Sequence, residues 1–368
     1  MSQRVPFMDL RPGPDAAAVH RAIQRVIDRG WFILGPELQA FEEESAAAMG
    51  GASAVGVGTG TDAIALLLRG LGIGPGDEVI TAPVSAAYSA LAIMMAGARP
   101  VFADLDPARL TLDPRAAEAA ITPRTKAIMP VHLYGQPADM PAFEAIAARH
   151  HLLLVEDACQ AHGATSAGRP VGSFGAGAAF SFYPTKNLGA LGDGGAMVVG
   201  DAALADRLKR LRNGGQTDRY RHVEFGVNSR LDEMQAAILR ARLPLLSGWT
   251  AKRRELAARY RTQLADAAIT VPPECDPGHV YHLFPVLSPD RDRVRAALAE
   301  RGIDTLIHYP IPLPQQDALA GTQPAHCPIA ARVANEVFSL PLHPHLTLAE
   351  VDMVSAAVRA CARSSEKL

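Results

Sequence analysis

The stretch Leu152-Leu153-Leu154-Val155-Glu156-Asp157 is a short apolar run that ends in two carboxylates. A run of this length that is apolar at every position is typical of a strand buried on both faces, as in parallel sheets covered by helices. Ligands of such sheets bind at the carboxyl ends of the strands. Residues 152–157 therefore predict an α/β fold in which Asp157 lies where the sheet binds its ligand.

Six further short apolar runs surround this strand, and helical patterns lie between many of them. Met140, Phe143 and Ala147, for example, recur at helical spacing. Strands that alternate with helices indicate a mainly parallel sheet, here of seven strands. The other expected strands are residues 55–57, 78–81, 100–103, 127–131, 178–182 and 196–199.

The character of the sequence changes near residue 245. Apolar side chains before that point follow helical spacing, with Asn228-Ser229 as the expected cap of their helix. A proline, a serine and a glycine between residues 244 and 248 then interrupt the pattern, and a charged helix is expected from about residue 251. We therefore expect a large domain over residues 1–245 and a smaller C-terminal α+β domain over residues 246–368. The helical series is Leu231, Met234, Ile238, Ala241 and Leu245.

The composition limits the classes of partner. The chain has 368 residues, 48% hydrophobic side chains and a formal net charge of −2, which provides no long-range attraction to nucleic acid or to an anionic membrane. Its four cysteines lie far apart without metal-ligand spacing, so we expect free thiols in a reducing compartment and no metal site. The start of the chain has no signal-type apolar core, and the longest uncharged apolar stretch is too short to span a bilayer. These features predict a soluble, cytoplasmic protein.

Lys186 is one of only five lysines and stands in Ser181-Phe182-Tyr183-Pro184-Thr185-Lys186-Asn187, just ahead of a glycine-rich stretch. A lysine on such a loop is ordinarily exposed and solvated. A buried lysine, however, has its ammonium form disfavoured by desolvation and can attack an aldehyde. With Asp157, 29 residues earlier, it supplies the two protein groups that pyridoxal phosphate chemistry requires, a Schiff-base lysine and a carboxylate beside the pyridine nitrogen. In isolation, Asp157 could instead cap a helix that starts at Ala158.

A glycine-rich turn precedes the helix expected over residues 63–69. The turn, Gly56-Val57-Gly58-Thr59-Gly60-Thr61-Asp62, lets the backbone approach an anion closely, and the first N–H groups of the helix and the Thr61 hydroxyl could hold a phosphate. Most such turns bind nothing, and the glycine spacing differs from the dinucleotide-binding fingerprint. The interpretation of Lys186 as an exposed loop residue loses weight because Asp157, Ser181 and this turn fall in the same α/β frame.

At these residues the chain strongly resembles the DegT/DnrJ/EryC1/StrS family, the sugar aminotransferases of the type I pyridoxal phosphate fold. The resemblance covers nearly the whole length. Its most specific parts are residues 180–195 and Asn228-Ser229-Arg230-Leu231-Asp232-Glu233-Met234-Gln235-Ala236-Ala237. Further matching parts are Val5-Pro6-Phe7-Met8-Asp9-Leu10, Gly35-Pro36-Glu37, residues 156–163 and Ser339-Leu340-Pro341-Leu342.

The resemblance implies a role for each matching residue. Lys186 would form the internal aldimine, and Asp157 would pair with the pyridine nitrogen of pyridoxal 5'-phosphate (PLP), which alternates with its pyridoxamine form (PMP). Asn228 would reach the phosphate in the neighbouring subunit's site, which implies a homodimer with shared active sites; the helix cap is its alternative. His162 would approach the sugar substrate or serve as a hydrogen-bonded group behind the site. The other implied cofactor ligands are Gln160, near the 3'-hydroxyl, and Gly60, Thr61 and Ser181, at the phosphate.

The residue type at position 186 also selects a reaction. Relatives that dehydrate sugars carry histidine there, so Lys186 favours transamination. Ala86 stands where an aromatic residue commonly stacks on the cofactor ring, and Tyr88 is a candidate to compensate. Three other positions depart from the family pattern, and the last two concern the acceptor pocket: Ala176 in place of aspartate, and Gly214 and Pro314 in place of frequent histidines.

The expected activity is transfer of an amino group from an amino acid, with L-glutamate as the donor, to a ketone on a nucleotide-diphosphate-linked deoxysugar. Arg219 and Arg221, in the expected loop 216–222, are candidates to contact the diphosphate, or are simply solvated. Tyr88 and Tyr309 are further substrate candidates. A keto-cyclitol acceptor is the alternative within this class, and a regulatory protein without turnover is the alternative from another class. The intact lysine–aspartate pair argues against the regulator, and no basic patch supports DNA binding.

Overall fold

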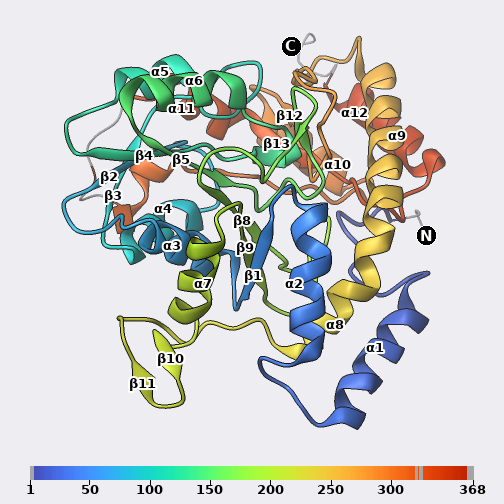
Figure 1. Cartoon of the computed structure of the whole chain (residues 1–368). Coiled ribbons are helices and arrows are strands. Elements are labelled where there is room, and N and C mark those ends of the chain that lie inside the picture. Colours follow the sequence, from blue (N-terminus) through green and yellow to red (C-terminus); the bar gives the residue numbers. More distant parts are fainter. Residues whose placement is uncertain (1–3, 320–321, 323–325, 363–368) are drawn as a thin grey trace.

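The computed structural model describes residues 4–319, 322 and 326–362 (Figure 1). Its centre is a seven-stranded sheet with the order β1-β9-β8-β5-β4-β2-β3. Each of the seven apolar runs in the sequence coincides with one of these strands, so the expected α/β fold is confirmed. The strands are β1 Ser53–Val57, β2 Glu78–Thr81, β3 Arg99–Phe102, β4 Thr125–Met129, β5 Leu153–Asp157, β8 Gly177–Ser181 and β9 Gly195–Val199.

The sheet is mainly parallel, and β9 is the reversed strand. It pairs antiparallel with β8 and with β1, whereas β8, β5, β4, β2 and β3 form parallel pairs. The reversal follows from the connection, because residues 182–194 join β8 to β9 as a loop instead of a crossover helix. Ser181 pairs with Gly195 where this loop begins and ends. Lys186 lies in the loop, which two neighbouring strands therefore hold in place.

Helices cover both faces of the sheet, as β5 demonstrates. Leu154 belongs to a core cluster that includes α6, and the next residue, Val155, belongs to a cluster that includes α3. Burial on both faces explains why the run that precedes Asp157 is apolar at every position. The helices in this part of the chain are α1 Ala16–Arg29, α2 Pro36–Ala48, α3 Gly60–Gly70, α4 Tyr88–Met95, α5 Pro114–Ala119, α6 Met140–His150 and α7 Ala202–Leu211.

Helix α8 Glu233–Arg242 is the expected helix, but its predicted cap is wrong. Asp232 caps it by accepting the N–H of Gln235 over 2.8 Å. Ser229 is instead occupied elsewhere, since its Oγ donates to Asp62 over 2.7 Å. Three cap-forming residue types precede this helix, and the one next to its first turn is the one used. The turn η2 Leu243–Leu245 then leads into α9 Leu246–Leu264, which begins earlier than the expected residue 251.

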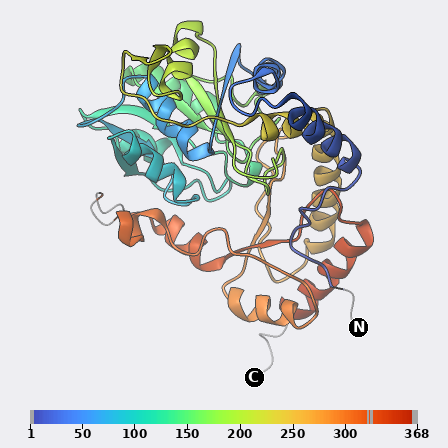
Figure 2. The same ribbon diagram turned by 90° about the horizontal axis from the view of Figure 1, so that it is seen from below.

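The C-terminal elements form a second core, on the opposite side of the molecule from the sheet in Figure 2. It joins Leu256 of α9 to Phe284 of β12 and Val354 of α12. Val5, near the N-terminus, is fully buried in the same core and pairs with Ile303. The domain boundary at residues 245 and 246 stays a prediction. The remaining elements of this part of the chain are β12 Phe284–Leu287, α10 Arg291–Ala299, β13 Val337–Leu340 and α12 Leu348–Ala362, together with α11 Pro328–Glu336, which belongs to the core beside the sheet instead.

Short elements complete the fold. The expected loop 216–222 is in fact a hairpin, β10 Gln216–Asp218 with β11 Arg221–His222, which projects from the body in Figure 1. Within the described ranges, none of the helices combines the length and the hydropathy needed to cross a bilayer. The remaining elements are η1 Leu133–Gly135, β6 Thr165–Ser166, β7 Arg169–Pro170, η3 Leu313–Gln315 and η4 Asp317–Leu319.

Candidate active site

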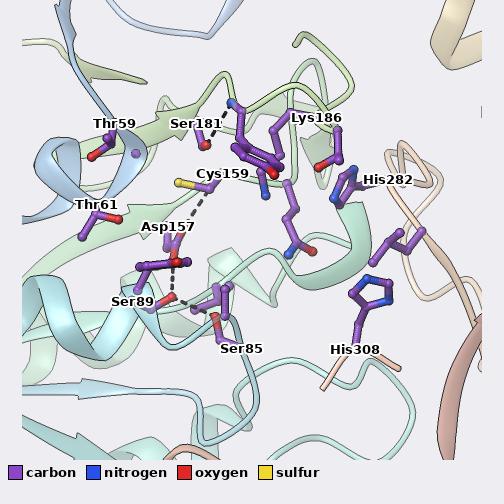
Figure 3. Close-up of a pocket in the computed structure, with 18 of the residues that line it drawn as sticks. Thr59, Thr61, Ser85, Ser89, Asp157, Cys159, Ser181, Lys186, His282 and His308 are labelled. Carbon is purple, nitrogen blue, oxygen red and sulfur yellow. Dashed lines mark hydrogen bonds between the residues drawn. The ribbon is translucent and has the colours of Figure 1, made fainter. Parts of the chain in front are cut away.

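A cavity of about 690 Å³ lies at the carboxyl end of the sheet (Figure 3). The ends of β5 and β8, the start of α3 and the loop 182–194 form one wall, and the segments around residues 282 and 308 contribute another. A volume in this range is typical of small-molecule sites. The predicted site residues that line the cavity are Gly60, Thr61, Tyr88, Asp157, Gln160, Ser181, Lys186 and Tyr309.

Asp157 is the last residue of β5 and is 3% exposed. Its Oδ2 accepts the hydroxyl of Ser89 over 2.6 Å, and its Oδ1 accepts the N–H of Cys159 over 3.2 Å. The segment that follows Asp157 forms turns, so the alternative of a cap for a helix at Ala158 is wrong. The carboxylate is instead held rigidly at the floor of the cavity.

The neighbouring Glu156 is buried but has a structural task. Its Oε1 accepts the N–H groups of Gly172 and Phe174, each over 2.9 Å. Its Oε2 lies 3.0 Å from Nε2 of His132, whose Nδ1 accepts the N–H of Ala138, so that Nε2 carries the proton. These contacts fix the end of β5 and thus the direction in which Asp157 points.

Lys186 lies in a tightly closed loop. Its N–H donates to the carbonyl of Tyr183 over 2.8 Å, and a Cβ at Gly189 would lie only 2.5 Å from the carbonyl oxygen of Pro184. Arg242, paired with Asp15, donates to the carbonyl of Gly189. Burial lowers the pKa of Lys186, while the Cys159 thiol and the Asp157 carboxylate act against that shift. A lysine in this setting has a larger fraction of free amine at neutral pH than an exposed lysine, and the free amine is the form that attacks carbonyls and accepts protons.

The start of α3 packs directly on β8 and forms a cradle for an anion. Thr59 caps the helix by accepting the N–H of Asp62 over 3.0 Å, a role that was not predicted from the sequence. A Cβ at Gly60 would lie 2.6 Å from Cβ of Ser181, so only glycine permits this approach. The first N–H groups of the helix and the hydroxyls of Thr61 and Ser181 therefore converge on one end of the cavity.

Gln160 and Tyr309 meet across the cavity wall. Nε2 of Gln160 donates to the Tyr309 hydroxyl over 3.1 Å, and its Oε1 accepts the N–H of Tyr134 over 2.7 Å. Burial raises the pKa of Tyr309 to about 12, so its hydroxyl stays protonated at neutral pH. The pair links the end of β5 to the C-terminal part of the chain.

Two histidines of the cavity wall were missed in the sequence. Burial, followed by the nearby Lys186, lowers the pKa of His308 to about 4 and that of His282 well below its usual range. His282 Nδ1 lies 3.3 Å from Oδ1 of Asn187, and His308 Nδ1 lies 2.9 Å from Oγ of Ser339. Both rings are thus neutral groups that flank the lysine. His308 could have been suggested by its place next to Tyr309, but no local pattern marks His282.

Ala86 lines the cavity, and Tyr88 stands at its rim with 62% of its surface exposed. Tyr88, the candidate to compensate for Ala86, is the first residue of α4. Its side chain consequently emerges from the start of a helix, one residue beyond Ala87.

Four predicted residues lie outside the lining of this cavity. His162 is fully buried against Phe180 and Phe182, with ring centroids 5.4 and 5.7 Å apart, and within the described residues neither ring nitrogen has a hydrogen-bond partner. Burial lowers the pKa of His162 to about 3. The other three, Asn228, Arg219 and Arg221, are exposed on and near the β10–β11 hairpin.

The residues present fit PLP. The cradle at Gly60 would suit a phosphate, the buried carboxylate of Asp157 would suit a protonated ring nitrogen, and Lys186 lies in the same cavity. Together, the mainly parallel sheet, the lysine loop and this cradle define an aminotransferase of the PLP-dependent type I fold.

Comparisons with known proteins identify the family. Residues 15–359 match the DegT/DnrJ/EryC1/StrS aminotransferase family, and the chain belongs to it. Its members depend on PLP. The dTDP-3-amino-3,4,6-trideoxy-alpha-D-glucose transaminase of Streptomyces venezuelae is 51% identical over 364 residues, which are 97% of this chain and 96% of the relative. The erythromycin biosynthesis sensory transduction protein EryC1 of Saccharopolyspora erythraea is 47% identical over 362 residues, 97% and 99% of the two chains.

A solved structure confirms the fold at the level of the whole chain. The S. venezuelae DesV crystal structure, described as a complex with a ketimine intermediate, superposes with a TM-score of 0.95 and 50% identity over 100% of both chains. The protein is therefore an aminotransferase, and the expected type I fold is confirmed.

Proposed function

We propose that the protein transfers an amino group from L-glutamate to a ketone of a nucleotide-diphosphate-linked sugar. The observation that carries this proposal is one cavity that contains a lysine of lowered pKa, a buried carboxylate and a phosphate cradle. The S. venezuelae relative, whose name places it on a dTDP-linked amino sugar, supports this class of acceptor.

The chain's own residues divide the chemistry among them. When bound, PLP withdraws electrons from the carbon that bears the transferred amino group, which makes its proton removable. Asp157 would hold the ring nitrogen protonated, and the N-terminus of α3 with Ser181 would hold the phosphate. Lys186, as a neutral amine, would take the proton from the α-carbon of the donor and would give it back during the transfer of the amino group. Its lowered pKa favours the amine over the ammonium ion.

The acceptor would enter between the sheet and the C-terminal elements. Gln160, Tyr309 and His308 present neutral hydrogen-bonding groups there, which suit sugar hydroxyls. Arg219 and Arg221 lie exposed on the hairpin and supply cations for a diphosphate. We place their target in the cavity of a second subunit, because in their own chain they lie outside the cavity lining.

A homodimer is part of the proposal. Asn228 is exposed, and no described contact of its side chain within the chain competes with a role in a partner's site. Trp31, Phe32 and Ile33 are 54%, 50% and 42% exposed, which is a large apolar surface for a single copy. We further place the enzyme in the cytoplasm, because its four cysteines are free thiols.

The proposal is tested by isotope transfer. The purified protein, loaded with PLP, is incubated with ¹⁵N-labelled L-glutamate and a panel of dTDP- and UDP-linked 3-keto and 4-keto sugars, with a keto-cyclitol as the alternative acceptor. Mass spectrometry should detect ¹⁵N in one nucleotide-linked aminosugar, and Lys186→Ala should form none. Label that appears only in the cyclitol would favour the alternative acceptor. Label in no acceptor, with cofactor bound, would favour a regulatory role like the one named for EryC1.

A further inference from the structure

Two buried serines extend the hydrogen bonds of Asp157 into the segment that follows β2. Ser89, in the first turn of α4, donates to Oδ2 of Asp157 over 2.6 Å, and Oγ of Ser85 lies 2.8 Å from Oγ of Ser89. The three side chains are between 2% and 3% exposed. Figure 3 shows them in a row at one end of the cavity. The row connects the carboxylate to a part of the chain that is distant in sequence.

The charge of the carboxylate fixes the order of the protons in this row. An ionised carboxylate only accepts hydrogen bonds, so Ser89 must donate its single proton to Asp157. Ser89 can then only accept from Ser85, which must be the donor of the second bond. The serine row therefore gives Oδ2 of Asp157 a donor whose own orientation is fixed by a second hydrogen bond.

The remaining contacts of Asp157 leave its outward lone pairs free. Each carboxylate oxygen accepts one protein donor, Oδ2 from Ser89 and Oδ1 from the N–H of Cys159. The main chain of Asp157 is fixed as well, because its carbonyl accepts the N–H of His132 over 3.0 Å. Each oxygen retains acceptor capacity toward the cavity that Asp157 lines. The carboxylate is thus presented to a cationic ligand group in one orientation.

We propose that Ser89, supported by Ser85, is a positioning residue that keeps the carboxylate of Asp157 aimed at the protonated ring nitrogen of the cofactor. The inference rests on the proposed function only in that PLP and PMP bind in this cavity. Burial of an anion is costly unless donors compensate it, and a donor that cannot rotate away gives the anion a fixed direction. Ser89 satisfies this requirement because the helix holds it and Ser85 occupies its acceptor side.

The test separates the ring nitrogen from every other contact of the cofactor. The affinities of apoenzyme for PMP and for 1-deaza-PMP, in which a C–H group replaces the ring nitrogen, are measured by equilibrium dialysis. Ser89→Ala should weaken PMP binding about tenfold, the loss expected for one hydrogen bond to a charged group, and should leave the deaza compound within about twofold. Ser85→Ala should act in the same direction by about threefold, and Ser89→Thr should retain wild-type affinity.

The outcomes are distinguishable. Equal losses for both ligands in Ser89→Ala, or an unchanged affinity for PMP, would overturn the inference. If Ser89→Ala does not fold, as judged by its melting temperature, Ser85→Ala carries the same test, and equal affinities for PMP before and after that substitution would overturn the inference. Wild-type protein that binds neither compound would instead overturn the proposed function, and this inference with it.

Discussion

The carboxyl end of β5 and the β10–β11 hairpin are opposites in how they hold their functional groups. At the end of β5, Asp157 is 3% exposed and both of its oxygens have donors. On the hairpin, Tyr220 is 81% exposed, and Arg219 contacts only that ring, at 5.4 Å, among the contacts described for its side chain. The hairpin projects away from the sheet in Figure 1.

The contrast teaches which parts of the proposed reaction one chain can supply. The groups proposed for proton transfer, and the phosphate ligands proposed at the start of α3 and at Ser181, lie within a single chain and are fixed by strands and helix ends. The cations suited to a diphosphate, and Asn228, are presented outward, where a second subunit can use them. The buried region should therefore respond to substitutions through cofactor binding and stability, and the exposed region through assembly and acceptor affinity.

Gly60→Ala tests the buried region directly. The new Cβ would lie 2.6 Å from Cβ of Ser181, with the main chain of Ser181 at 3.1 Å, so the start of α3 must move. Loss of backbone N–H bonds to a charged phosphate should weaken PMP binding by about 100-fold in equilibrium dialysis. Gly200→Ala, which has no atom within 4 Å of its Cβ, is the matched control. PMP affinity within threefold of wild type in Gly60→Ala would show that the cradle does not hold the phosphate.

His162→Leu tests whether His162 is a buried neutral group. Because burial lowers its pKa to about 3, the folded protein leaves it unprotonated below pH 6.5, where the unfolded chain binds a proton. Its contribution therefore reduces stability as the pH falls below about 6.5 and vanishes above that value. Between pH 7.5 and pH 5, urea unfolding should show the variant gaining about 2 kcal/mol relative to wild type. A constant difference between the two proteins over this range would contradict the prediction.

Asn228 offers a test of the exposed region by complementation. Asn228→Ala should lower activity about tenfold, the effect of one lost hydrogen bond to a phosphate. Heterodimers of Asn228→Ala with Lys186→Ala contain one site with both residues intact, if Asn228 serves the partner's site. Unfolding and refolding an equal mixture should then restore activity above the sum of the two variants. No restoration, with dimers present by light scattering, would place Asn228 outside the partner's site.

Arg221→Ala should have the smallest effect. An exposed cation contributes little to binding and is screened by salt, so the KM for the nucleotide sugar should rise about threefold, and less at high ionic strength. The KM for L-glutamate should stay constant. Arg115→Ala, whose side chain is 91% exposed, is the control. Equal changes for both substrates would assign Arg221 a general structural role.

Much of the fold followed from local patterns. The seven strands were predictable because each is buried on both faces, and Asp157 and Lys186 were recognisable because Asp157 ends one of those strands and Lys186 follows another. The positions of Ser89, His282 and His308 were not, because they depend on how distant segments pack around the cavity. The cap of α8 could not be predicted either, because the side chains of Asn228, Ser229 and Asp232 can all accept an N–H group at the start of a helix.

The hairpin illustrates a second limit. Gln216–Asp218 and Arg221–His222 are too short and too polar to show strand periodicity, so they were predicted as a loop. His162 shows the converse, because its place in a family motif suggested substrate contact while the phenylalanines of β8 and the following loop enclose it. Exposure and burial of single polar residues are decided by tertiary packing, which one sequence does not reveal.

The most direct test of the central claim is the half-reaction with the donor alone. PLP-loaded enzyme, mixed with L-glutamate and no acceptor, should form one equivalent of 2-oxoglutarate per subunit, while Lys186→Ala should form it on the order of 10³-fold more slowly. Lys209→Ala, an exposed lysine of α7, should match wild type. Wild-type protein that forms no 2-oxoglutarate, or a Lys186→Ala variant that forms it at the wild-type rate, would contradict the account.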